Sequence, residues 1–113
     1  MPHNARAVLI AYSPSRSRDA LVRTLASHGV SVLVADDHAQ LMRELMNERV
    51  VVVATDLIGQ PTDTLALLRL RGRSRGIAID IRALPNTADS MDEMALGLAR
   101  HCQIPRPALA PIG

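Results

Sequence analysis

Aromatic side chains are almost absent from this chain of 113 residues, which has no Trp, no Phe and one Tyr at position 12. Its core must therefore be built from Val, Leu, Ile, Ala and Met. Proteins that bind single-stranded DNA or RNA usually stack the bases on aromatic rings. Because the chain has almost no such rings, nucleic-acid binding is not expected of this domain alone.

Lysine is missing as well, since all thirteen Lys or Arg residues are arginine, and the formal net charge is only +2. A net charge this small gives no general electrostatic footprint for nucleic acid. Cys102 is the one cysteine, which excludes an internal disulfide and a cysteine-based metal site. The four histidines do not have the spacing of metal ligands. We therefore expect neither a metal nor another cofactor.

Long apolar runs are also lacking. No stretch approaches the length of a membrane span, and no charged segment followed by an apolar one forms a signal peptide. The expectation is a cytoplasmic protein without a membrane partner. The length suits a single domain over residues 1–113. Residues 103–113 contain three prolines and suit either an edge strand or a linker.

The residues that are present follow two alternating patterns. Short aliphatic runs predict four strands, at 7–11, 30–35, 50–55 and 77–81. Apolar residues at helical spacing predict helices at 16–28, at 38–48, after Thr62 or Asp63, and after a capping box formed by Ser90 and Glu93. This alternation predicts an α/β fold with a doubly wound parallel sheet, right-handed crossovers and helices on both faces.

Asp56 is the first candidate for a functional residue. It follows Val50–Val53, and four consecutive valines are typical of a central parallel strand that is buried on both faces. Ligands and chemistry collect at the carboxyl ends of the strands in such sheets. The neighbours of Asp56 at that edge therefore decide what the domain can do.

Three segments together resemble the receiver domain of response regulators. Residues 27–45 (SHGVSVLVADDHAQLMREL) resemble its second-strand region, 50–61 (VVVVATDLIGQP) its phosphoacceptor strand and loop, and 104–108 (IPRPA) the segment with a Lys-Pro pair after its fifth strand. The resemblance implies the flavodoxin-like strand order 2-1-3-4-5. It also implies that Asp56 is the counterpart of the phosphoacceptor aspartate.

The other receiver positions depart from that family's pattern. Tyr12 and Ser13 match the acidic pair that holds Mg²⁺, Arg82 or Ala83 matches the Thr or Ser after the fourth strand, and Arg106 matches the lysine. A divalent cation normally neutralises the charge in phosphoryl transfer to a carboxylate, and Mg²⁺ prefers carboxylate and water oxygens. One carboxylate is a poor magnesium site. The sequence therefore indicates a degenerate receiver, or pseudo-receiver.

Two interpretations stay open for the acidic residues. Asp56 is either a strand-end carboxylate, hydrogen-bonded to its loop or paired with Arg82 or Arg106, or a working phosphoacceptor. Asp36 and Asp37 end the second strand, where helix capping is the preferred account and a relocated metal pair is the alternative.

The loop after the first strand is a candidate anion site. Ser15, Arg16, Ser17 and Arg18 precede a helix N-terminus, which attracts phosphate or a nucleotide through free N–H groups and the helix dipole. No glycine-rich phosphate motif is present. A solvated loop is the alternative.

The end of the chain leaves no room for the helix that closes a receiver, since only seven residues follow Arg106. A missing or truncated fifth helix would leave apolar sheet and first-helix surface uncovered, which usually marks an interface. We expect a homodimer, a protein partner or a downstream output domain to cover it. The predicted function is non-enzymatic regulation through protein contact in bacterial signalling or transcription. A phosphorylated receiver and an anion- or nucleotide-binding regulator are the alternatives.

Overall fold

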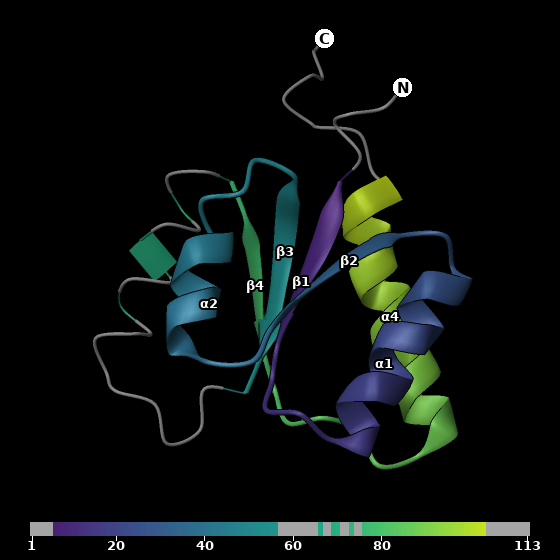
Figure 1. Cartoon of the computed structure of the whole chain (residues 1–113). Coiled ribbons are helices and arrows are strands. Elements are labelled where there is room, and N and C mark those ends of the chain that lie inside the picture. Colours follow the sequence, from purple (N-terminus) through teal and green to yellow (C-terminus); the bar gives the residue numbers. More distant parts are fainter. Residues whose placement is uncertain (1–5, 57–65, 67–68, 71–72, 74–75, 104–113) are drawn as a thin grey trace, which may run out of the picture.

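The computed structural model describes residues 6–56, 66, 69–70, 73 and 76–103 of the chain. Its strands are β1 (Ala7–Ala11), β2 (Ser31–Ala35), β3 (Val50–Thr55) and β4 (Ala78–Ile81). Its helices are α1 (Arg16–Ser27), α2 (His38–Glu44) and α4 (Ala88–Gln103) (Figure 1). All four predicted strands are confirmed to within one residue at each end. Of the predicted tail at 103–113, Gln103 is the last residue of α4, and residues 104–113 lie outside the described residues.

The four strands form one parallel sheet in the order β2-β1-β3-β4. This order agrees with the first four strands of the flavodoxin-like arrangement. The predicted fifth strand belongs to the tail, outside the described part of the chain. The helix predicted between β3 and β4 is described only at Ala66, Arg69, Leu70 and Arg73, which are helical.

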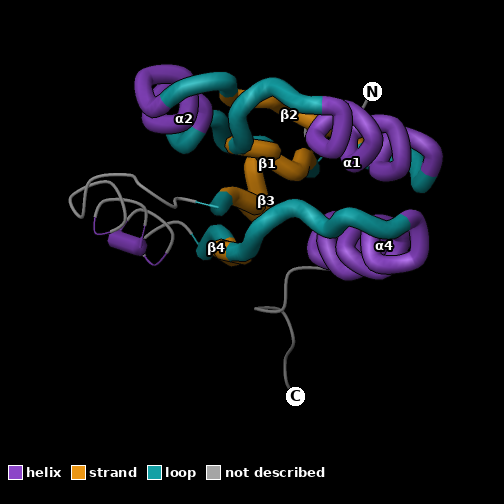
Figure 2. The backbone as a smooth tube through the Cα atoms, turned by 90° about the horizontal axis from the view of Figure 1, so that it is seen from below, coloured by secondary structure: helices purple, strands orange, loops and turns teal. Residues whose placement is uncertain are grey.

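Helices cover both faces of the sheet, as predicted. The chain moves from β1 to β2 in one direction and from β2 to β3 in the other, so right-handed crossovers place α1 and α2 on opposite faces. Figure 2 shows α2 on one side of the strands, with α1 and α4 side by side on the other. Each face has its own hydrophobic cluster, one with α1 and α4 and one with α2.

The valine run in β3 contributes to both clusters. Val52 packs on the side of α1 and α4, and Val53 packs on the side of α2. Both are fully buried, with 0% of their surface exposed. The prediction of a central strand buried on both faces is confirmed.

The position of α4 corrects the expectation of an uncovered first-helix surface. A right-handed crossover from β4 to a strand beyond it would place α4 on the face of α2. Instead α4 lies beside α1, where Met94 and Leu98 join the cluster that contains Leu21 and Leu25 of α1. Because α4 covers this surface, the argument for a homodimer through it is wrong.

Local hydrogen bonds set the ends of the helices. Gly29 has a φ of +79°, which suits glycine at the predicted end of α1. Asp37 caps α2 by accepting from the backbone N–H of Gln40, so the capping prediction is confirmed. The capping box at Ser90 is wrong, because Thr87 takes the capping position and its hydroxyl accepts from the N–H of Ser90.

The predicted second helix is shorter than expected. It ends at Glu44, not at residue 48. The Asn47 side chain accepts a hydrogen bond from the N–H of Arg49, and its carbonyl accepts one from Val50. Asn47 therefore organises a turn that leads into β3. Within the described residues, no helix has the length and apolar character that crossing a membrane requires.

Candidate functional site

The carboxyl edge of the sheet brings together the strand-end residues that the sequence singled out. Tyr12 and Ser13 follow β1, Asp36 follows β2 and Asp56 follows β3, and all four border one shallow hollow. The hollow measures about 50 Å³. That is room for a few water molecules or a small hydrated ion, not for a nucleotide.

Tyr12 is a buried structural residue at this edge, with 3% of its surface exposed. Its hydroxyl donates a hydrogen bond of 2.7 Å to the backbone carbonyl of Arg82. Burial raises the pKa of Tyr12, and the negative charges of Asp80 and Asp56 raise it further. The phenol therefore stays neutral and keeps its proton for the hydrogen bond.

Arg82 extends the same connection across the sheet. Its backbone N–H donates to the carbonyl of Thr55 at 3.0 Å, which continues the β3–β4 pairing by one residue. Its guanidinium binds Asp80 in two hydrogen bonds of 2.9 Å, and this pairing raises the pKa of Arg82. One interpretation of the sequence paired Arg82 with Asp56. In the structure Arg82 is bound to Asp80 instead. Ala83 follows it as an exposed residue.

Asp56 lies at the predicted position but is not paired with Arg82, one of the partners considered for it. It is half-buried at the end of β3. Among the described residues its carboxylate makes no hydrogen bond or ion pair. Arg106, the other partner considered, lies outside the described part of the chain. Asp56 thus lies at the rim of the hollow without a partner among the described residues.

The acidic residues after β2 do not act as a relocated metal pair in this arrangement. Asp37 is engaged in capping α2, and Asp36 is paired with the guanidinium of Arg18. The described residues contain no group of three or more His, Cys, Asp or Glu side chains that could hold a metal ion. A divalent cation would have to compete with Arg18 for Asp36.

Arg18, one of the residues proposed for the anion loop, has its guanidinium engaged within the described chain. Besides Asp36, its guanidinium contacts the carbonyl of Tyr12 at 3.5 Å and the carboxylate of Asp19 at 3.6 Å. Its Nε is buried without a hydrogen-bond partner in the described chain. Arg18 therefore joins the ends of β1 and β2, and a free anion would have to compete with Asp36 for it.

The other three residues of the proposed anion loop have two different roles, capping a helix and lining a cleft. The Ser15 hydroxyl caps α1 by accepting from the N–H of Arg18 at 3.0 Å. Arg16 and Ser17 face a second cleft, of about 330 Å³, between the starts of α1 and α4. The opposite wall includes Asn86 and Asp92, which no sequence motif marked as functional. These residues are far from Arg16 along the chain, so the cleft could not be predicted from the sequence.

Comparison with known proteins identifies no relative: no family model, curated protein or solved structure matches this chain.

Proposed function

We propose that this chain is a receiver-like regulatory domain with a flavodoxin-like fold that acts through protein contact and not through phosphoryl transfer. The observation that carries the proposal is the end of β1. Where a receiver holds acidic magnesium ligands, this chain has Tyr12, whose hydroxyl is occupied by the Arg82 carbonyl, and the neutral Ser13. Asp56 therefore faces no second carboxylate from β1.

The charges around Asp56 support the same function. Phosphoryl transfer to a carboxylate needs positive charge that can reach both the attacking oxygen and the phosphoryl group. Two described arginines at this edge are already engaged, Arg18 with Asp36 and Arg82 with Asp80. The domain has a receiver-like fold, and it regulates by binding to a protein partner or to a second copy of the chain.

Phosphorylation of the full chain tests the proposal. The chain is incubated with acetyl phosphate and Mg²⁺, and intact mass spectrometry reads the product, with Asp56→Asn as the matched control. We expect no phosphorylated species in either sample. Phosphorylation that disappears in Asp56→Asn would establish the working receiver and overturn the proposal.

A gain-of-function variant makes the negative result informative. Ser13 is exposed and borders the same hollow as Asp56. Ser13→Asp supplies the missing β1 carboxylate without disturbing the buried Tyr12. We expect Mg²⁺ to perturb the amide resonances at the ends of β1 and β3 in this variant and not in the parent. Equal magnesium binding by the parent would contradict the charge argument.

Light scattering then separates the two kinds of partner. A concentration-dependent dimer identifies a second copy of the chain as the partner. A monomer at all concentrations leaves a different protein as the partner. Since α4 covers the face first considered for self-association, neither result depends on that face.

A further inference from the structure

The cleft between the starts of α1 and α4 has the size of a ligand site. It measures about 330 Å³, against about 50 Å³ for the hollow beside Asp56. Cavities that hold small molecules usually measure about 300–1,000 Å³. Of these two hollows, the one between the helices is therefore the better candidate for a small-molecule site.

The cleft follows from the packing of the two helices. Both cover the same face of the sheet and both begin at its carboxyl edge, so their first turns lie side by side (Figure 2). The residues of these turns that line the cleft include Ala20 and Ala88, whose methyl groups leave the space unfilled. Pro85 and the buried Met91 complete an apolar lining.

The polar lining carries one charge of each sign, from different helices. Arg16 belongs to α1 and Asp92 belongs to α4. Within the described chain neither side chain forms an ion pair or a hydrogen bond, and the amide of Asn86 is also free. The Thr24 and Thr87 hydroxyls are already used, in hydrogen bonds to the backbone. Arg16, Asp92 and Asn86 thus remain available to a ligand.

We propose that this cleft binds a free amino acid with an apolar side chain, with its carboxylate at Arg16 and its ammonium group at Asp92. The apolar body would cover Met91 and Pro85. An anion alone would be repelled by Asp92, and an uncharged ligand would remove both charges from water without compensation. This proposal goes beyond contact with a protein partner, since it names a small molecule that the domain would sense.

Matched ligands test the charge assignment directly. The full chain, labelled with ¹⁵N, is titrated with L-leucine, with 4-methylpentanoate, which lacks the ammonium group, and with 3-methylbutylamine, which lacks the carboxylate. For leucine we expect saturable shifts concentrated in the amides of residues 16–24 and 86–92. Each analogue should bind at least about tenfold more weakly, because each loses one charged contact.

Two variants identify the partner of each ligand group. Arg16→Gln should reduce the affinity for leucine about tenfold and leave 3-methylbutylamine unchanged or tighter. Asp92→Asn should reduce the affinity for leucine similarly and leave 4-methylpentanoate unchanged or tighter. Both residues are exposed, so neither substitution should impair folding.

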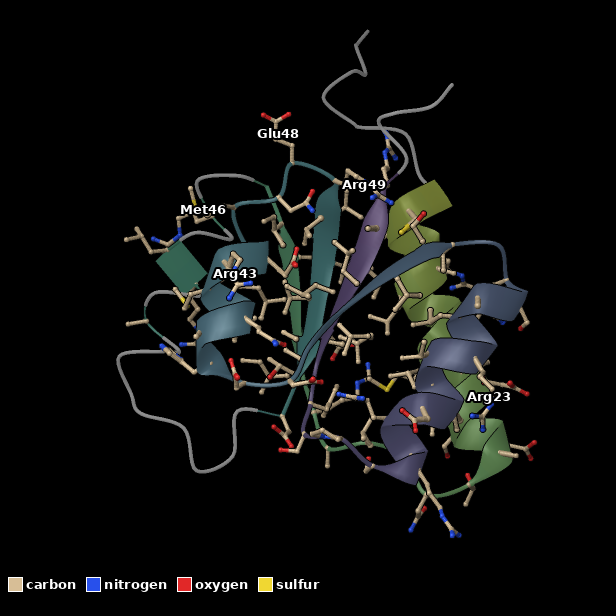
Figure 3. All side chains as sticks on the ribbon, in the orientation of Figure 1. Arg23, Arg43, Met46, Glu48 and Arg49 are labelled. Carbon is tan, nitrogen blue, oxygen red and sulfur yellow. The ribbon has the colours of Figure 1, made fainter. Side chains whose placement is uncertain are left out.

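Matched controls change the same charges elsewhere. Arg43→Gln alters α2, which lies across the sheet from α1 (Figure 3), and Glu93→Gln alters an exposed residue of α4 outside the cleft. Both should bind leucine as the parent does. The proposal fails if leucine gives no saturable shift, if 4-methylpentanoate or inorganic phosphate binds as tightly as leucine, or if the cleft variants behave like these controls.

Discussion

The hydroxyl of Tyr12 and the carbonyl of Arg82 join positions 70 residues apart in the sequence at a distance of 2.7 Å. Tyr12 follows β1 and Arg82 follows β4, so the bond passes over the end of β3, which lies between them. A carboxylate could not donate this hydrogen bond. Tyr12 thus gives the carboxyl edge of the sheet a neutral structural connection.

The ionisation of Tyr12 should make the chain less stable in alkaline solution. The folded state holds the pKa of this phenol above its ordinary value of about 10, mainly through burial. Above pH 10 the unfolded chain releases the proton while the folded chain keeps it, so stability falls as pH rises. The slope should approach about 1.4 kcal/mol per pH unit, measured by urea unfolding with far-UV circular dichroism. Tyr12→Phe should remove this slope.

The composition simplifies the interpretation of that alkaline unfolding experiment. The chain has no lysine and one tyrosine, so few groups titrate in this range. Cys102 is the exception, because burial also raises its pKa. The measurement should therefore use a Cys102→Ala background. An alkaline slope that persists in Tyr12→Phe would show that another group causes it. At neutral pH, loss of the hydrogen bond should cost about 1 kcal/mol.

Arg18 and Asp36 should be energetically coupled. A double-mutant cycle with Arg18→Gln and Asp36→Asn, read by urea unfolding, should give a coupling of about 0.5–1 kcal/mol. We expect no more than this because the Asp36 side chain is 49% exposed and water screens the pair. The coupling should decrease with added salt. A cycle with Asp19→Asn serves as the control and should give less, since that contact is longer, at 3.6 Å.

Asp37 should stabilise α2 through its capping hydrogen bond to the N–H of Gln40. Asp37→Ala should reduce the free energy of unfolding by about 1 kcal/mol, whereas Asp37→Asn keeps an acceptor and should retain most of it. Amide hydrogen exchange should accelerate in α2 in the alanine variant, because a helix of seven residues has little stability of its own. Equal losses in the two variants would contradict the capping role.

The strands could be predicted from the sequence because their signal is local. The valine run at 50–53 is typical of a strand buried on both faces, and β3 has the bounds predicted for it. The face chosen by α4 could not be predicted in this way. The spacing of Met91, Met94 and Leu98 shows that the helix has an apolar side, but both faces of the sheet are apolar. Only the connection of the chain across the sheet decides between them.

Part of the candidate site could likewise be predicted from the sequence, and part could not. Asp56 was predictable, since the end of a buried parallel strand follows directly from the pattern. The pairing of Arg18 with Asp36 had a weaker signal, namely that the ends of adjacent strands β1 and β2 must meet. The cleft between α1 and α4 had none. It depends on two helices from distant parts of the chain starting side by side, which follows from the unpredicted position of α4.

That position leads to a sharp test on α4 itself. Leu98 is 1% exposed in the cluster that joins α4 to α1 and the sheet, whereas Leu96, on the same helix, is 44% exposed. Leu98→Ala should reduce the free energy of unfolding by about 2–5 kcal/mol, because it removes buried methyl groups and leaves a cavity. Leu96→Ala makes the same chemical change with the same effect on helix propensity, so it should cost well under about 1 kcal/mol. Urea unfolding of both variants measures the difference. Equal losses would mean that α4 does not cover this face. The first-helix surface would then be open again, and self-association through it would once more be the expected behaviour.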